Sequence, residues 1–299
     1  MARRAPPPRR PGSPIFAGLA PASFSLRQIL HVSDLHFGPP HLPAVARGLE
    51  ALIADRRPDL VVISGDLTQR AKPHQFREAR HFVDRLPVPC VAVPGNHDVP
   101  LYRVWERALV PFGAYRKHFD RDLEPVWSDP ELQVVGLNTA YNWTFKNGHV
   151  SRRQLSRLAE RLAAGAPGAL RVVVAHHHLI APPEFSKHKP VAGSRRIVDA
   201  LTAAGADVIL SGHLHLTYRA SSEDFHPFGR RGALILHSGT TTSNRRRHSE
   251  RDQNTCNWLR IDAEAIEVSH LRWQPASESF AVEGTHRHRR SDLGLEPPG

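Results

Sequence analysis

The sequence predicts an α/β fold. Short runs rich in Val, Ile and Leu alternate with stretches of helical periodicity, and polar residues directly follow several of the apolar runs. Strand and helix patterns that alternate along a chain favour a largely parallel sheet covered by helices. A chain of 299 residues with 40% hydrophobic content is long enough to bury such a core. We therefore expect a single domain of the size of a catalytic domain.

The individual elements follow from local patterns. Strands are expected at residues 26–32, 59–64, 88–93, 132–137, 170–175, 206–210, 233–237, 256–261 and 265–273. Helices are expected at residues 42–56, 73–86, 101–121, 151–164 and 194–204. The fourth helix has a serine cap at Ser151, leucines at helical spacing and a glycine after its end. In the helix expected at 101–121, we interpret Trp105, Phe112, Tyr115 and Phe119 as the packing face, although these rings could instead stack on a base or sugar.

Composition divides the chain into a body and two tails. Residues 1–24 are basic and proline-rich and are expected to be disordered, residues 25–274 form the domain, and residues 275–299 are expected to be a flexible tail. No apolar segment approaches the roughly 18 residues of a membrane span, so we expect no membrane partner. Cys90 and Cys256 lie in apolar runs and read as core residues, which favours a reducing, cytoplasmic location.

The positive charge is concentrated in three short runs. Residues 1–14, 245–251 and 285–290 carry +4, +3 and +3 of the formal net charge of +11. The body is therefore nearly neutral, and a basic groove for nucleic acid is not supported. The oligomeric state cannot be predicted from the sequence.

Polar residues cluster where the predicted strands end. They are Asp34 and His36, Asp66, the group Asn96, His97 and Asp98, the run His176 to His178, and the pair His213 and His215. The carboxyl ends of parallel strands line the ligand crevice of an α/β sheet, so these side chains are expected to meet at one site. Histidines two positions apart in an extended segment can also reach a common centre.

The mixture of residue types indicates a metal site. Carboxylates and imidazoles without thiolates suit Mn, Fe or Zn better than Mg or Ca. The predicted set holds too many donors for one ion of four to six ligands but enough for two. Two neighbouring ions can clamp the attacking and leaving oxygens of a displacement at phosphorus.

The motifs "DLH", "GD", "GNHD", a histidine after the next strand, and "GHLH" occur in this order between roughly residues 26 and 262. They resemble the signature of the calcineurin-like metallophosphoesterase family, and the chain is most similar to the bacterial class III phosphodiesterases of the cyclic-nucleotide type. The resemblance implies a four-layered α/β/β/α sandwich, with two mixed β-sheets flanked by helices. It also implies a site for two divalent or mixed-valence ions of Mn, Fe or Zn.

The same resemblance implies a role for each site residue. The first metal would be held by Asp34, His36, Asp66 and His215. The second would be held by Asp66, Asn96, His176 and His213, with Asp66 shared and His177 left open as the alternative to His176. His97 resembles the family's catalytic histidine, which stabilises the phosphoryl charge or protonates the leaving oxygen. Asp98 either orients His97 or makes a structural hydrogen bond.

The resemblance implies a phosphoric ester hydrolase that attacks a small phosphodiester, such as a cyclic nucleotide, with a hydroxide bridging the two metals. The segment "GDLTQR" carries Gln69 where protein phosphatases of the family carry aspartate, which argues against phosphoprotein substrates. Arg245, Arg246 and Arg247 either contact substrate phosphate or belong to a solvated loop. The alternatives are a phosphomonoesterase, a nuclease, or a non-catalytic scaffold, and no predicted ligand is missing as the scaffold would require.

Overall fold

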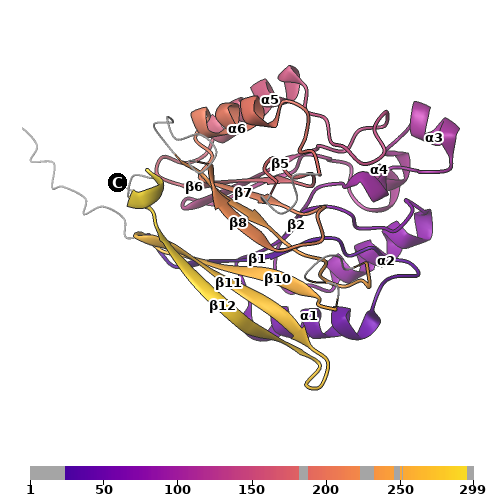
Figure 1. Cartoon of the computed structure of the whole chain (residues 1–299), viewed down its shortest axis with the longest axis horizontal. Helices are drawn as coiled ribbons and strands as arrows, with labels where there is room; N and C mark the ends of the chain where they lie inside the picture. The colour runs from indigo at the N-terminus through magenta and orange to yellow at the C-terminus, as the bar shows by residue number, and fades with distance from the viewer. Residues whose placement is uncertain (1–23, 182–187, 223–231, 246–249, 251, 295–299) are drawn as a thin grey trace, which may run out of the picture.

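The computed structural model describes residues 24–181, 188–222, 232–245, 250 and 252–294. In this part of the chain two six-stranded mixed sheets pack face to face, and helices cover the outer face of each (Figure 1). The expected four-layered α/β/β/α sandwich is confirmed.

The first sheet has the strand order β12-β11-β10-β1-β2-β3. Its strands are β1 (Arg27–Val32), β2 (Leu60–Ile63), β3 (Cys90–Ala92), β10 (Thr255–Ile261), β11 (Ala265–Gln274) and β12 (Ser279–Arg289). Strands β1, β2 and β3 run parallel, whereas β10, β11 and β12 are antiparallel to their neighbours. Helices α1 (Pro43–Arg56), α2 (Pro73–Asp84) and α4 (Gly113–His118) contribute residues to the core on its outer face.

The second sheet has the strand order β4-β5-β6-β7-β9-β8. Its strands are β4 (Val126–Ser128), β5 (Leu132–Leu137), β6 (Leu170–Ala175), β7 (Val208–Ser211), β8 (Tyr218–Ser221) and β9 (Leu234–His237). The four central strands β5, β6, β7 and β9 are parallel, and the edge strands β4 and β8 are antiparallel. Helices α5 (Arg152–Ala163) and α6 (Ser194–Ala203) pack on its outer face (Figure 1).

The alternation of side chains along the strands explains why both faces of each sheet are apolar. In β2, Leu60 and Val62 enter the core between the sheets, while Val61 and Ile63 join the core under α1 and α2. A strand that is buried on both faces is a continuous apolar run, which is the pattern of "LVVI". The inter-sheet core thus holds the carboxyl ends of the central parallel strands in fixed positions.

The expectation of one helix over residues 101–121 is wrong, because the structure has two short helices there. Helix α3 (Val104–Leu109) ends before Pro111, and α4 begins at Gly113. Proline cannot donate the backbone hydrogen bond that a continuous helix needs. Tyr115 and Phe119 are buried as expected, but Trp105 is 80% exposed and does not belong to a packing face.

The domain extends past the expected boundary at residue 274 into the expected flexible tail of residues 275–299, of which residues 295–299 lie outside the described residues. Residues 279–289 form β12, which pairs with β11 along its length, and a short 3-10 helix η5 (Ser291–Leu293) follows. The basic residues of β12 concealed the strand, because they lie on its exposed positions while Phe280 is buried. Residues 1–23 of the expected amino-terminal tail lie outside the described residues. No helix in the described segments is long and apolar enough to cross a bilayer.

Candidate metal centre

The candidate site lies where the carboxyl ends of five parallel strands from the two sheets meet. Strand β1 leads to Asp34 and His36, β2 to Asp66, and β3 to the 3-10 helix η1 (Asn96–Asp98), while β6 leads to His176 and β7 to His213 and His215. Backbone hydrogen bonds join neighbouring strand ends, with Asp34 N donating to Gly65 O at 3.1 Å and Gly212 N to His176 O at 3.0 Å. All seven predicted metal ligands are therefore positioned by one layer of strand ends.

The backbone is left-handed at five of these residues. The φ angles lie between 49° and 71° at Asp34, His36, Asp66, His213 and His215. Each such conformation in a non-glycine residue costs about 1–3 kcal/mol, and these conformations concentrate at functional sites. The strained turns direct the side chains off the strand ends and toward one another.

Two glycines allow the strand ends to approach closely. A Cβ atom at Gly95 would lie 2.2 Å from Asp66 Oδ1, and one at Gly65 would lie 2.5 Å from His176 Nδ1. Gly65 also has a φ of +93°, which side chains rarely adopt. A larger residue at Gly95 or Gly65 would therefore displace Asp66 or His176.

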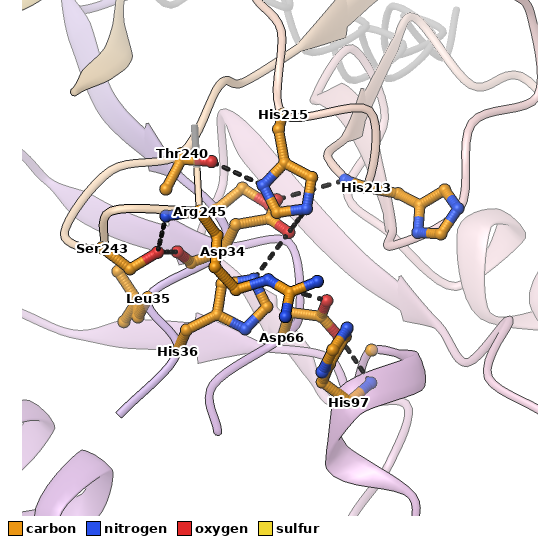
Figure 2. A network of polar contacts seen from close by, with 12 residues as sticks. Asp34, Leu35, His36, Asp66, His97, His213, His215, Thr240, Ser243 and Arg245 are labelled. Atoms are coloured by element: carbon orange, nitrogen blue, oxygen red, sulfur yellow. Dashed lines mark hydrogen bonds and ion pairs between the residues drawn. The ribbon is translucent and has the colours of Figure 1, made fainter. Parts of the chain in front are cut away.

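Asp34, His36 and His215 form one cluster. His36 Nε2 lies 3.5 Å and His215 Nε2 lies 3.6 Å from Asp34 Oδ1. Figure 2 shows Asp34 between the two histidines, with Asp66 beside them. The second oxygen of Asp34 accepts hydrogen bonds from Ser33 Oγ at 2.7 Å and from His213 N at 3.1 Å. Asp34 therefore keeps Oδ1 directed toward the histidines.

A second cluster forms around Asn96. Its Oδ1 lies 3.0 Å from His213 Nδ1 and 3.2 Å from His176 Nε2, and these two ring nitrogens are 3.3 Å apart. His176 Nε2 is also 3.4 Å from Asp66 Oδ1, while Asp66 Oδ2 is 3.7 Å from His36 Nε2. Asp66 thus stands between the two clusters, with one oxygen facing each.

His97 lies at the edge of the clusters. Its backbone N–H donates to Asp66 Oδ1 at 2.8 Å, and its ring lies 4.9 Å from that of His36. Ring atom Nδ1 donates to the carbonyl of Gln69 at 2.9 Å, so Nε2 is the ring nitrogen that does not take part in this hydrogen bond. Burial lowers the pKa of His97 to about 4, and the charges of His36 and Arg245 act in the same direction.

Asp98 does not touch the ring of His97 but holds the loop that carries it. Its carboxylate accepts backbone hydrogen bonds from Gly95, Leu67 and Thr68 at 2.8 to 3.0 Å, and one from the Thr68 hydroxyl. Burial and the nearby charge of Asp66 raise the pKa of Asp98 to about 6. Its observed contacts are those of a structural hydrogen-bond acceptor.

The electrostatics favour ionised carboxylates in the centre. Burial raises the pKa of Asp34, but His215 and His36 outweigh it and hold this pKa below its usual value. Burial has the same effect on Asp66, and the neighbouring His176 and His97 keep its pKa well below the usual range. Burial would lower the pKa of His176, but the charge of Asp66 raises it to about 9. Positive charge is therefore stabilised at the point where the clusters meet.

The three consecutive histidines have different surroundings. His176 joins the clusters, and its Nδ1 donates to the carbonyl of Ser64 at 2.8 Å. His177 Nδ1 is bonded to Thr139 Oγ1 at 2.8 Å, and its ring lies 4.7 Å from that of His213. His178 Nε2 lies 3.2 Å from the carbonyl of His188.

The donor set fits divalent cations. Four groups of three residues bring possible ligand atoms within 4.8 Å of one another; three groups combine carboxylates with imidazoles, and the fourth consists of His176, His177 and His213. Asp34 Oδ1 and both ring nitrogens of His36 are buried without a hydrogen-bond partner in the described structure. Buried polar atoms are normally satisfied, and a cation would satisfy Asp34 Oδ1 and His36 Nε2. The residues shared between groups are Asp34, His36, Asp66 and His176.

A hollow of about 350 Å³ opens over the clusters, and its lining includes residues that the sequence patterns did not reveal. Lys146 and Asn147 come from the loop after β5, where no motif marks them. Arg245 lines the same hollow, and Figure 2 shows its side chain reaching toward Asp66 and His97. Arg246 and Arg247 lie outside the described residues. Thr240, whose Oγ1 is 2.5 Å from His215 Nδ1, belongs to the threonine run after β9.

Comparisons with known proteins agree with this geometry. The family model for calcineurin-like phosphoesterases matches residues 27–216. A cAMP/cGMP dual specificity phosphodiesterase of Mycobacterium tuberculosis is 30% identical over 172 residues, which cover 55% of this chain and 51% of that protein. A probable cyclic nucleotide phosphodiesterase of Rhodococcus erythropolis is 26% identical over 210 residues, covering 64% of this chain and 66% of that protein.

A solved structure supports the fold. The purple acid phosphatase of yellow lupin seeds superposes with a TM-score of 0.69 at 12% identity, covering 93% of this chain and 56% of that one. The chain spans less than two thirds of the length of the first curated relatives that it matches. The region matched by the family model includes all the strand-end residues from Asp34 to His215.

Proposed function

The chain belongs to the calcineurin-like phosphoesterase family, and we propose that it is a phosphodiesterase for a small diester such as a cyclic nucleotide. It is a phosphoric ester hydrolase with clustered candidate metal ligands. The observation that carries the proposal is the convergence of Asp34, Asp66 and Asn96, with four histidines, beneath one hollow. Relatives named as cyclic nucleotide phosphodiesterases support a diester as the substrate.

We propose that Asp34, His36, Asp66 and His215 hold one metal. Asp66, Asn96, His176 and His213 would hold the other. The two oxygens of Asp66 face different histidines, which supports its role as the shared ligand. When bound, two ions of Mn, Fe or Zn would supply Lewis-acid activation of water and of the phosphoryl group.

The protein side chains orient the substrate and move the proton. His97 is proposed to act at the phosphoryl group through Nε2, because its Nδ1 donates to the carbonyl of Gln69. Only the doubly protonated ring can give a proton from Nε2 to the leaving oxygen, and the negative charge of a bound diester would favour that form. Asp98 supports this geometry by fixing the loop on which His97 sits. Arg245 lies beside His97 in the lining of the hollow, where its guanidinium would attract the anionic diester. A cytoplasmic location remains part of the proposal, and it accords with two free cysteines.

The test is hydrolysis of bis(p-nitrophenyl) phosphate by protein supplied with Mn or Fe. Asn96→Ala and His97→Ala should each reduce kcat by at least about 100-fold, the usual contribution of a proton donor or a metal ligand. His81→Ala, at an exposed position of α2, is the matched control and should retain full activity. Circular dichroism should show the same folded state in all variants.

Full activity in the metal-free protein, or in both site variants, would refute the proposal. If the proposal holds, a panel of cyclic nucleotides, dinucleotides, glycerophosphodiesters and phosphomonoesters, tested with each metal, would identify the substrate. Preference for a monoester would replace the diesterase assignment with a phosphomonoesterase.

A further inference from the structure

Helix α3 and the loop after β5 expose an unusual number of apolar side chains beside the hollow. We call this surface the apolar lip; its members are Tyr102, Val104, Trp105, Leu109, Val110, Trp143 and Phe145. Within α3 the usual arrangement is inverted, because Trp105 is 80% exposed whereas Arg107 is 6% exposed. Contiguous exposed apolar surface of this kind marks a binding site more often than an ordinary surface does.

The two segments of the apolar lip are fixed to each other by Arg107. Its guanidinium donates to the carbonyl of Pro100 at 2.9 Å and to that of Thr144 at 2.6 Å. The same guanidinium lies 4.5 Å from the centre of the Phe145 ring, a distance typical of a cation–π contact. The apolar residues are therefore presented by a braced structure.

The apolar lip reaches the hollows of the candidate metal centre through Phe145. A second hollow, of about 210 Å³, shares Asn96, His97, Lys146 and Arg245 with the first. One part of its wall is apolar and consists of Val99, Leu101 and Phe145. Arg70 completes the cationic part of the wall, and its guanidinium lies 5.7 Å from the ring centre of Tyr102. Lys146 and Arg245 thus line both hollows, whereas Val99, Leu101 and Phe145 line the second hollow and not the first.

This order of charge and apolar surface matches an amphiphilic ester. We propose that the second hollow and the apolar lip bind the hydrocarbon chain of an amphiphilic phosphodiester, whose phosphate lies among Arg70, Lys146 and Arg245. The inference rests on the proposed function for its reaction and adds the class of substrate. A hydrocarbon chain would cover apolar side chains that otherwise face water.

The test measures binding, and phosphorus NMR of the ligands after each titration checks that they have not been hydrolysed. Methyl, butyl and octyl esters of methylphosphonate are titrated calorimetrically into the metal-supplied protein, below the critical micelle concentration of the octyl ester. A fully buried methylene contributes about fourfold in affinity, so even partial burial predicts at least about tenfold tighter binding from methyl to octyl. Phe145→Ser and Trp143→Ser should each reduce this ratio to about threefold or less, because they remove apolar contacts of the chain.

Val282→Ser is the control, since Val282 is an exposed apolar residue on β12. It should leave the octyl-to-methyl ratio unchanged. Equal affinity for all three esters in the wild-type protein would overturn the inference, as would an unchanged ratio in both lip variants. Binding only to phosphatidylcholine vesicles would overturn the inference in favour of a lipid-surface contact. Self-association that is lost in Trp143→Ser, with no dependence of binding on chain length, would overturn it in favour of a dimer interface. Chain-dependent binding without hydrolysis of any diester would instead refute the proposed function alone.

Discussion

His176 and His177 are adjacent in the chain, yet their side chains have different polar partners, Asp66 for His176 and Thr139 for His177. His176 Nε2 lies 3.4 Å from Asp66 Oδ1, whereas His177 Nδ1 is hydrogen-bonded to Thr139 Oγ1 at 2.8 Å. Both rings come close to His213, but among the described contacts it is His176 that is paired with Asp66. The sequence alone left this choice open, and the geometry favours His176 as the ligand.

We therefore predict that His176→Ala loses about one of two bound metal ions per chain, while His177→Ala retains both. Removal of this imidazole leaves three of the four proposed ligands, Asp66, Asn96 and His213, which should hold the ion less tightly. Elemental analysis after gel filtration measures the metal content. The same metal content in His176→Ala as in the wild-type protein, with loss in His177→Ala, would reverse the assignment.

A second prediction concerns the threonine that orients His215. Thr240→Val removes the hydroxyl that lies 2.5 Å from His215 Nδ1, and it should weaken metal affinity by about 10- to 100-fold, as loss of an orienting partner typically does. Thr139→Val is the matched control, because it removes the equivalent partner of His177, which is not a proposed ligand. Competition with a chelator measures both affinities. Equal weakening in the two variants would argue against a specific role for Thr240.

The sequence predicted those parts of the site that lie on regular strands. The positions after β1, β2, β3, β6 and β7 follow from apolar runs that end in Asp, Asn or His, and the structure brings these residues together. Lys146 and Trp105 could not be placed in this way, because their positions depend on how two irregular segments are joined by Arg107. Thr240 was missed because a threonine run after a strand is common and gives no sign of its partner.

The carboxyl-terminal strand β12 is a second feature that local sequence patterns did not predict. Residues 279–289 are mostly polar because only one face of an edge strand is buried, so the apolar signal is weak. The strand forms because it pairs with β11, and such pairing between segments cannot be predicted from the composition of residues 279–289 alone. The helix expected over 101–121 is interrupted for a local reason, since Pro111 lies between α3 and α4 and cannot donate a backbone hydrogen bond.

A third prediction follows from the close approach of Gly95 to Asp66. Gly95→Ala would place a methyl group 2.2 Å from Asp66 Oδ1 and 2.4 Å from its backbone nitrogen. The turn must shift to relieve this overlap, and overpacking of this kind costs about 1–3 kcal/mol. We expect a lower melting temperature and loss of metal binding. Gly284→Ala is the control, because nothing lies within 4 Å of the added Cβ, and it should preserve both properties.

The last prediction concerns stability toward acid. His237 is fully buried at the end of β9, and neither of its ring nitrogens has a hydrogen-bond partner among the described residues. Burial lowers its pKa to about 3, and the nearby His178 and His31 act in the same direction. Burial likewise lowers the pKa of His31 to about 3. Both rings are therefore neutral in the folded protein at pH values where the unfolded chain binds protons.

The sign of the effect follows from this difference. A histidine whose pKa is lowered by folding contributes its full stability above about pH 6.5, and that stability decreases as the pH falls toward 3. Each of the two residues should reduce the free energy of unfolding by about 2 kcal/mol between pH 6.5 and 5. Urea unfolding of the chelator-treated protein across this range measures the slope without a contribution from bound metal.

Substitution isolates the contribution of one ring. His237→Leu replaces the imidazole with an apolar side chain that cannot bind a proton, so the loss of stability between pH 6.5 and 5 should shrink by about 2 kcal/mol. His81→Leu, at an exposed position of α2, should keep the wild-type slope. An unchanged slope in His237→Leu would mean that the ring is already protonated, or exposed to water, in the folded protein. The buried histidines outside the metal clusters would then not explain the sensitivity of the fold to acid.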